Sequence, residues 1–238
     1  MQKLLSLLFL STTIAYAQNN DTSPPGCGVS DVTHQTVGEA TSFGHGLLAA
    51  PRNAIRINNL KWELPIAAAT AILITQVDRP ANNRIQSPST EQTAGRWSNA
   101  GLGMELAAGA VTYVAGCHSQ DHYFRDTGFK ALAAMGTASL EDLVLKAAFD
   151  RQYPVNHQIT GHFWGGGGSF PSGHAANSFA FASVFAHRYP RNKWVKWGSY
   201  ALATGVSLSR YPAKKHFTSD ILVGGTLGYV TGTYLANH

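Results

Sequence analysis

Long segments without charged side chains constrain the fold of this chain more than any other feature. Only 13% of its 238 residues are charged, and the uncharged segments include 64–77, 106–120, 175–187 and 221–238. Apolar residues recur at helical spacing, as in Phe181, Val184 and Phe185, and no window alternates as a strand would. We therefore predict an all-α fold, a single-domain helical bundle, with helices near 64–77, 102–115, 130–149, 175–186, 194–209 and 220–235.

These uncharged segments are short for membrane spans. A spanning helix needs about 20 apolar residues; three of the segments have 14, 15 and 13 residues, and only 221–238 reaches 18. That last segment carries Gly224, Gly228 and Gly232 at four-residue spacing, which lets a neighbouring helix approach closely. With a mean hydropathy of −0.10, the sequence favours helices packed on one another over a polytopic membrane protein.

The N-terminus has the pattern of a secretory signal peptide. Lys3 precedes an apolar run, and Ala15-Tyr16-Ala17 is a small-x-small cleavage site. Export would permit a disulfide between Cys27 and Cys117, the only two cysteines, although a buried Cys117 with a free Cys27 fits equally well. We predict an exported protein, periplasmic if the source is Gram-negative, with membrane contact left open. The predicted regions are a signal peptide at 1–17, an N-terminal arm at 18–45 and the helical-bundle domain at 46–238.

The charge balance limits the classes of partner. The chain has 18 Lys and Arg against 13 Asp and Glu, a net charge of +5, with no run of five like charges. Its charged fraction is about half the ~25% of an average soluble domain. This composition excludes a dense nucleic-acid-binding face and favours a small anionic substrate or a lipid headgroup. The sequence does not determine an oligomeric state.

The tetrapeptide Pro171-Ser172-Gly173-His174 lies between a glycine run and a predicted helix. It should form the first turn of that helix, where free N–H groups and the helix dipole attract an anion. Gly173 lets the backbone come close to a ligand, and His174 could hand a proton to a leaving oxygen. Taken alone, the tetrapeptide also fits an ordinary helix cap with Ser172 as the N-cap residue.

A second cluster consists of Ser209, Arg210, His216 and Asp220. His216 and Asp220 are four residues apart and share one face of a helix. A carboxylate there can fix the imidazole tautomer and leave the other ring nitrogen free as a nucleophile. The guanidinium of Arg210 matches phosphate oxygens. The alternative for this cluster is a surface ion pair on a basic stretch.

Together with Lys146, these clusters resemble the type 2 phosphatidic acid phosphatase and vanadium haloperoxidase superfamily, whose motifs are K-x6-R-P, P-S-G-H and S-R-x5-H-x3-D. The second and third motifs match at every specified position, and the three cover 146–220. The resemblance implies a helical, metal-independent phosphatase in which His216 attacks phosphorus, Asp220 orients it and His174 protonates the leaving alkoxide. The residues that it implies for holding the phosphate oxygens are Lys146, Ser172, Gly173 and Arg210.

The first motif departs from the family pattern, because Tyr153 stands where an arginine is expected before Pro154. Tyrosine can donate a hydrogen bond but brings no charge, and a lost charge-assisted contact costs ~1.5–3 kcal/mol. Arg151, two residues earlier, could take over, so we count both Arg151 and Tyr153 among the phosphate-binding candidates. The change leaves open a weakened phosphatase, a changed substrate, or a non-catalytic phosphate- or lipid-binding protein.

The sequence thus predicts an exported phosphatase of the acid phosphatase or phosphatidic acid phosphatase type. It would hydrolyse phosphomonoesters, with lipid phosphates and diphosphates as candidate substrates. No cofactor or metal is expected: His118 and His122 have the spacing of metal ligands, but no third ligand is identifiable. Vanadate could occupy the phosphate site, and a vanadate-dependent haloperoxidase is the alternative from another reaction class, although the short chain argues against it.

Overall fold

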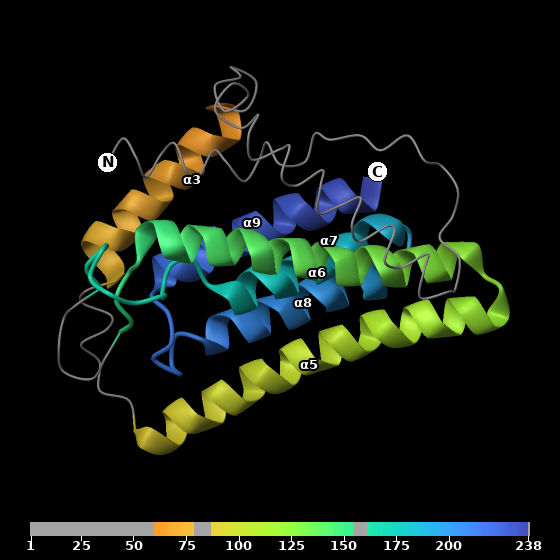
Figure 1. Cartoon of the computed structure of the whole chain (residues 1–238), viewed down its shortest axis with the longest axis horizontal. Helices are drawn as coiled ribbons and strands as arrows, with labels where there is room; N and C mark the ends of the chain where they lie inside the picture. The colour runs from red at the N-terminus through yellow and green to blue at the C-terminus, as the bar shows by residue number, and fades with distance from the viewer. Residues whose placement is uncertain (1–59, 79–86, 155–160, 238) are drawn as a thin grey trace.

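Every regular element in the described part of the chain is a helix (Figure 1). The computed structural model describes residues 60–78, 87–154 and 161–237. The predicted all-α bundle is confirmed, and a helix is found at each of the predicted positions. The elements are α3 (Leu60–Ile72), which continues as the π-helix η2 (Leu73–Val77), α5 (Pro88–Ser119), α6 (His122–Phe149), α7 (Gly173–Arg188), α8 (Lys193–Ser209) and α9 (Thr218–Asn237).

Helices α5 and α6 begin earlier than the apolar pattern predicted, at residues 88 and 122 rather than 102 and 130. Local capping explains both starts. Ser87 accepts a hydrogen bond from the N–H of Thr90 at 3.2 Å, with Pro88 in the first helical position. Asp121 accepts from the N–H of Phe124 at 3.0 Å. Caps of this kind satisfy N–H groups that a helix leaves unpaired, so polar residues can start it.

Helix α7 is the central helix, and it contacts α6, α8 and α9 most extensively. Its contact with α9 depends on the predicted glycine stripe. A Cβ on Gly228 would lie 1.9 Å from the carbonyl oxygen of Ala176, and one on Gly232 would lie 2.2 Å from that of Ala180. Any larger residue would push the helices apart. Because residues 228 and 232 pair with 176 and 180 in the same order, α7 and α9 run in the same direction and start at the same end of the bundle.

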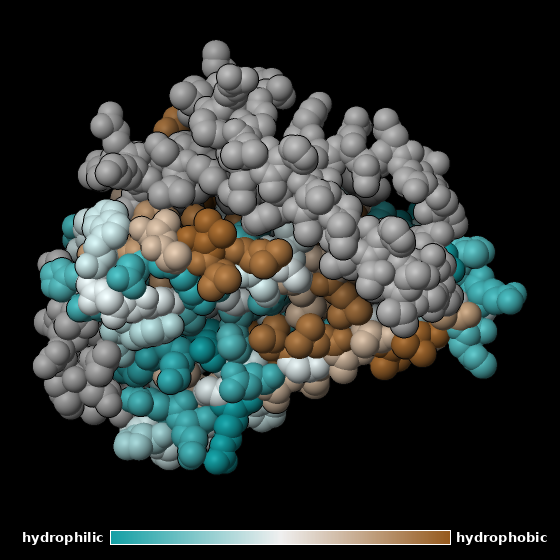
Figure 2. Space-filling model, viewed as in Figure 1, coloured by the Kyte–Doolittle hydropathy of each residue, from teal (hydrophilic) through white to brown (hydrophobic). Residues whose placement is uncertain are grey.

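Helix α5 is the one described helix that is long and apolar enough, by length and composition, to cross a membrane. Trp97, Val111 and Val114 on α5 are between 62% and 68% exposed. Figure 2 shows apolar side chains gathered along α5 and α6. Counting uncharged residues alone missed this length, because α5 continues through Glu105, which is fully buried and accepts a hydrogen bond from Ser178 of α7 at 2.6 Å.

Cys117, near the end of α5, is disulfide-bonded. Cys27, the other cysteine of the sequence, lies outside the described residues. The predicted signal peptide at 1–17 and the predicted arm at 18–45 also lie outside them.

Candidate active site

The N-termini of α7 and α9 meet at one end of the bundle and bring the sequence motifs together. The N–H of Ser172 donates to the carbonyl oxygen of Asp220 at 3.0 Å. The last turn of α6 and the C-terminal end of α8 reach the same place, because Lys146 and Arg210 both act electrostatically on His174. The predicted site residues assembled here are Lys146, Ser172, Gly173, His174, Arg210, His216 and Asp220.

The imidazole of His216 is buried and held in one tautomer. Its Nδ1 lies 2.7 Å from the carbonyl oxygen of Ser169. A carbonyl oxygen only accepts, so Nδ1 carries the proton and the lone pair is on Nε2. An imidazole fixed in this way is ready to act as a nucleophile through Nε2.

Asp220 lies near His216 without forming a direct hydrogen bond to its ring. Its carboxylate is fully buried, and Oδ2 accepts from the Ser169 hydroxyl at 2.5 Å and from the N–H of Phe217 at 2.9 Å. The same Oδ2 lies 3.7 Å from Nδ1 of His216. Asp220 is thus close enough to stabilise a positive charge on His216, while the hydrogen bond that orients the ring comes from Ser169. Sequence reasoning missed Ser169 because any residue can offer a backbone carbonyl.

Arg151 lies behind Asp220, and this differs from its predicted role. Its Nε donates to the carbonyl oxygen of Gly161 at 3.2 Å, one terminal nitrogen donates to the Ser219 hydroxyl at 2.8 Å and to Oδ1 of Asp220, and the other donates to Asp78 at 2.9 Å. Each of the three nitrogens has a partner in this network, which favours a structural role for Arg151 over the predicted contact with phosphate. The reason is electrostatic: two buried carboxylates need a cation between them.

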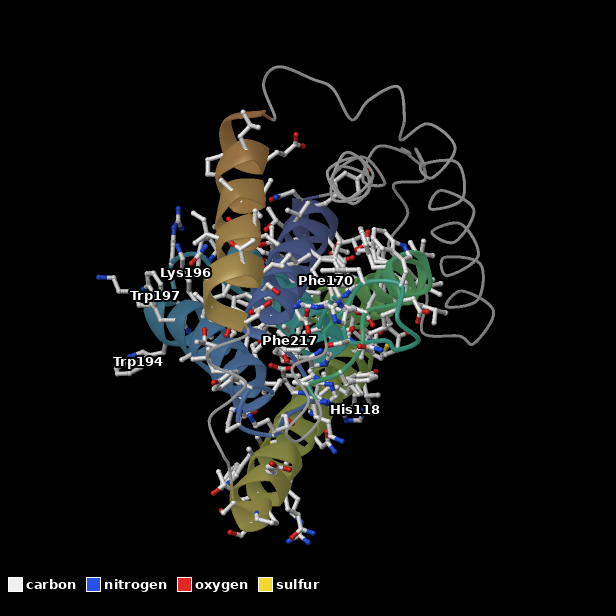
Figure 3. The ribbon with its side chains drawn as sticks, turned by 90° about the vertical axis from the view of Figure 1, so that its left-hand side faces the viewer. His118, Phe170, Trp194, Lys196, Trp197 and Phe217 are labelled. Atoms are coloured by element: carbon white, nitrogen blue, oxygen red, sulfur yellow. The ribbon has the colours of Figure 1, made fainter. Side chains whose placement is uncertain are left out.

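Aromatic rings complete the enclosure of Arg151. Its guanidinium lies 4.1 Å from the ring centre of Phe217 and 4.9 Å from that of Phe163. Figure 3 shows Phe217 and Phe170 within the bundle, whereas Trp194 and Trp197 project outward from α8.

Asp78 is a buried member of this network that sequence reasoning missed. It follows the π-helix η2, and its carboxylate accepts from the N–H of Ser219 at 3.2 Å and from the hydroxyl of Ser219 at 2.5 Å. The sequence around Asp78 suggested only a loop between two helices. The partners of Asp78 lie far along the chain, and no local pattern indicates them.

Lys146 and Gly173 face each other where α6 meets the first turn of α7. A Cβ on Gly173 would lie 3.3 Å from Nζ of Lys146 and 2.7 Å from Oδ2 of Asp142. Lys146 donates to that same Oδ2 at 2.6 Å. Glycine is therefore the residue that fits between the helix terminus and this charged pair.

Two donors at this end are buried without a partner. Among the described residues, neither the Ser172 hydroxyl nor Nε of Arg210 has a hydrogen-bond partner, whereas a terminal nitrogen of Arg210 donates to the Ser98 hydroxyl at 2.8 Å. Burial lowers the pKa of Arg210 from its usual value. An unsatisfied buried donor costs about 1–3 kcal/mol. Such donors beside the N-terminus of α7 form a site suited to an anion with several oxygens.

His174 stands in the first turn of α7. Its Nε2 lies 2.9 Å from Oδ1 of Asn99, a residue of α5 that the motifs did not indicate. Burial, followed by electrostatic interactions with Arg210, His216 and Lys146, lowers the pKa of His174 to about 4. A bound anion would offset those interactions and raise this pKa again.

Tyr153 lies at the rim of the site. Its side chain is 41% exposed, and its ring centre is 6.3 Å from that of His216. Its hydroxyl would lie 3.1 Å from a Cβ on Gly168. The tyrosine thus stands beside His216, the predicted nucleophile, without the charge of an arginine.

The predicted metal-ligand spacing falls across two helices. His118 is in the last turn of α5 and His122 begins α6, with Gln120 in a left-handed conformation between them at φ 56°. Within 60–78, 87–154 and 161–237, no group of three or more His, Cys, Asp or Glu residues is arranged to hold a metal ion.

Comparison with known proteins agrees with the fold and the motifs. Residues 127–237 match the PAP2 superfamily. A lipid A 1-phosphatase of Porphyromonas gingivalis is 37% identical over 65 residues, which are 27% of this chain and only 15% of that protein. The crystal structure of a transmembrane PAP2-type phosphatidylglycerolphosphate phosphatase from Bacillus subtilis has the same fold, with a TM-score of 0.52 and 21% identity over 73% of this chain and 94% of that one. Residues 127–237, which carry the motifs from Lys146 to Asp220, are therefore a PAP2 superfamily domain.

Proposed function

We propose that this chain is a metal-independent phosphatase that hydrolyses phosphomonoesters through a phosphohistidine on His216. The observation that carries the proposal is the position of His216. Its Nδ1 is fixed on the Ser169 carbonyl at 2.7 Å, so the lone pair of Nε2 is available. The same end of the bundle holds the unpartnered donors of Ser172 and Arg210. Phosphoryl transfer needs such positioning and charge stabilisation.

In the first step, Nε2 of His216 attacks phosphorus in line and the bond to the ester oxygen breaks. The leaving alkoxide takes a proton from His174, whose protonated form the bound phosphate favours. Asp220, 3.7 Å from Nδ1, stabilises the positive charge that His216 gains. In the second step, water gives a proton to His174 and attacks phosphorus, which releases phosphate and restores His216.

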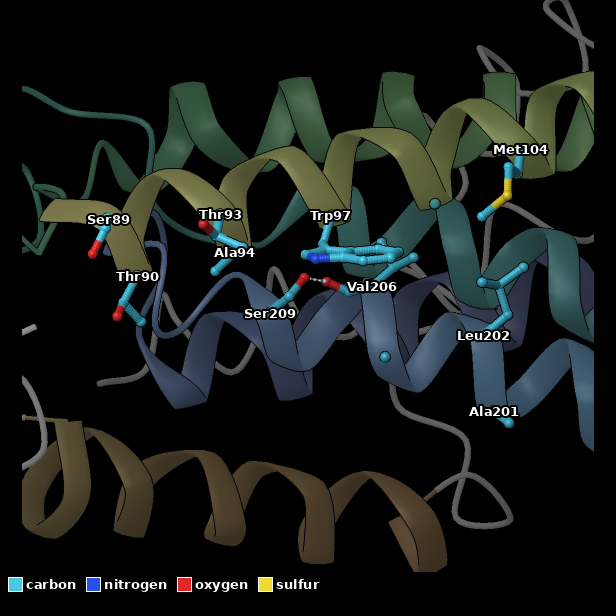
Figure 4. A pocket seen from close by; sticks show the side chains of 12 residues that line it. Ser89, Thr90, Thr93, Ala94, Trp97, Met104, Ala201, Leu202, Val206 and Ser209 are labelled. Atoms are coloured by element: carbon cyan, nitrogen blue, oxygen red, sulfur yellow. Dashed lines mark hydrogen bonds between the residues drawn. The ribbon is translucent and has the colours of Figure 1, made fainter. Parts of the chain in front are cut away.

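The substrate class that fits best is a lipid phosphate. A groove of about 700 Å³ runs between α5 and α8 (Figure 4). Its lining residues are Ser89, Thr90, Thr93, Ala94, Trp97, Gly101, Met104, Ala201, Leu202, Gly205, Val206 and Ser209. Trp97 and Ser209 of the groove are neighbours in sequence of Ser98 and Arg210, whose hydrogen bond borders the phosphate site. A phosphate held by Arg210 could therefore carry an alkyl chain into the groove. The names of the two relatives, both phosphatases of lipid phosphates, agree with this substrate class.

The first experiment measures hydrolysis of an aryl phosphate in the presence of EDTA. We expect the wild type to be active and His216→Ala to be inactive, with vanadate as an inhibitor. His187→Ala is a matched control, because Nδ1 of His187 also bonds a backbone carbonyl, that of Ser183 at 2.8 Å, and lies in the last turn of α7 away from the site. Retained activity in His216→Ala, or loss of wild-type activity with EDTA, would contradict the mechanism.

The substrate class is tested by comparing kcat/KM for a short-chain phosphatidic acid and for the aryl phosphate. Trp97→Ala should lower kcat/KM for the lipid while changing hydrolysis of the aryl phosphate little, because Trp97 lines the groove and not the phosphate site. An equal loss on both substrates would show that the groove does not hold the alkyl chain.

Export is part of the proposal and has its own test. The signal-peptide pattern at 1–17 predicts that the secreted protein begins at Gln18. N-terminal sequencing of protein recovered outside the cytoplasm measures this directly, and a retained Met1 would refute cleavage.

A further inference from the structure

The phosphate site contains a carboxylate that its proposed chemistry does not use. Asp142 in α6 is 7% exposed, and its Oδ2 accepts from Nζ of Lys146 at 2.6 Å. Its other oxygen, Oδ1, is buried and has no hydrogen-bond partner in the part of the chain that the structure describes. A carboxylate repels a phosphate dianion, and an unpartnered acceptor in a buried site needs a donor.

The carboxylate faces the place where the phosphate should bind. A Cβ on Gly173 would lie 2.7 Å from Oδ2 of Asp142, so the group stands at the first turn of α7. The charged and titratable groups around it are Lys146 on α6, His216 before α9 and, beside Gly173 on α7, His174. Burial raises the pKa of Asp142, and Lys146 and His216 oppose that rise.

We propose that Asp142 shares one proton with the bound phosphate and so selects the protonated form of the substrate. The inference rests on the proposed function and adds a specificity-determining residue to it. Either a P–OH group donates to Oδ1 of ionised Asp142, or protonated Asp142 donates to a phosphate oxygen. Both forms hold the same number of protons and the same charge. When that proton is lost, Oδ1 of Asp142 and the phosphate dianion have no proton left to share.

This sharing predicts a fall in activity as the pH rises. The second pKa of a phosphomonoester is about 6, so the free substrate and Asp142 together lose the shared proton above neutral pH. Loss of the shared proton should lower kcat/KM of the wild type by about tenfold per pH unit on its alkaline side, in addition to the fall that deprotonation of His174 causes in every variant. In Asp142→Asn the amide donates to the dianion at any pH, so its kcat/KM should fall much less over the same range.

Asp126→Asn is the matched control. Asp126 also lies on α6 and pairs with a lysine four residues later, Lys130, at 3.3 Å. It is not part of the phosphate site, so its pH profile should follow that of the wild type. Parallel profiles for the wild type and Asp142→Asn would overturn the proposal.

Calorimetry of inorganic phosphate binding separates this inference from the proposed function. Titrations at about pH 8 in two buffers of different ionisation enthalpy give the number of protons taken up with phosphate. The wild type should take up more protons than Asp142→Asn, or than Asp142→Ser if the asparagine variant does not fold. Equal proton uptake would overturn the inference even in an active enzyme. If the wild type takes up more protons than the variant but hydrolyses no phosphate ester, the inference about Asp142 stands and the proposed phosphatase activity is refuted.

Discussion

The two sides of His216 contain two buried arginines in opposite situations. Behind the imidazole, Arg151 is 2% exposed and each of its nitrogens has a partner, including Asp78 and Asp220. In front of it, Arg210 is 8% exposed, and its Nε has no partner. Both side chains are buried, but only Arg151 has a partner at each nitrogen; this difference supports a structural role for Arg151 and the proposed phosphate contact for Arg210.

The same contrast holds for two serines. Ser169 and Ser172 are both fully buried, but the hydroxyl of Ser169 donates to Asp220 at 2.5 Å while that of Ser172 has no partner. Folding alone rarely leaves buried polar atoms unsatisfied. Three of the buried atoms without a partner among the described residues, those of Ser172, Arg210 and Asp142, lie at the end of the bundle where the phosphate is proposed to bind.

Replacement of Arg151 should have the largest effect on stability. Arg151→Met leaves Asp78 and Asp220 buried without their cation, which costs about 3–5 kcal/mol of unfolding free energy. Arg210→Met removes a cation that faces hydroxyl groups, and we expect a change within about 1 kcal/mol. Guanidinium unfolding monitored by circular dichroism measures both. Equal losses would erase the distinction between the two arginines.

Replacement of Arg210 should have a large effect on activity, in contrast to its small effect on stability. Arg210→Met should lower kcat/KM by about 10- to 100-fold, since a charge-assisted contact with phosphate contributes ~1.5–3 kcal/mol. Lys215→Met, an exposed cation five residues later, is the control for net charge and should stay within about twofold of the wild type. If both variants lose activity equally, Arg210 acts only through the net charge of the protein and not through a contact with phosphate.

The serine pair should show a smaller version of this contrast. Ser169→Ala removes a hydrogen bond to a buried carboxylate and should cost about 1–3 kcal/mol of stability. Ser172→Ala removes a hydroxyl that has no partner, so stability should stay level or rise slightly while kcat/KM falls about 3- to 10-fold. Thermal unfolding and aryl phosphate hydrolysis test the two serines together. A loss of stability in Ser172→Ala without a loss of activity would show that this hydroxyl stabilises the fold and does not bind phosphate.

The smallest expected effect is a pH dependence of stability due to His174. Its folded pKa is lowered to about 4, mainly by burial, whereas an unfolded histidine titrates near 6.5. Between those values the unfolded chain binds a proton that the folded protein does not, so stability falls as the pH falls through this window. The slope is below one proton per pH unit because solvent screens the half-buried ring.

His174→Gln isolates that contribution. Denaturant midpoints at about pH 4.5, 5.5 and 7 should fall less steeply in the variant than in the wild type. Identical slopes would mean that His174 is as easily protonated in the folded protein as in the unfolded chain, and would contradict a lowered pKa for this imidazole.

The sequence by itself determined the class of fold and most of the front of the site. Uncharged segments with helical spacing can form only helices that bury their apolar faces, and the motifs around His174 and His216 name the groups that suit an anion. These signals are local, because residues three or four apart share one helix face. They also predicted the glycine stripe of α9 that brings it against α7.

Only the tertiary structure decided what each buried polar group faces. Asp78 and Arg151 are 73 residues apart in the sequence, and Arg210 and Ser98 are 112 apart. Such pairs form because a buried charge needs a partner from whichever helix packs beside it. The partners of Arg151 therefore favour a structural role that its sequence position did not suggest. Asp142 lies beside Gly173, although no motif indicated it. Helical periodicity fixes which face is buried, but the packing of whole helices decides which atoms meet there.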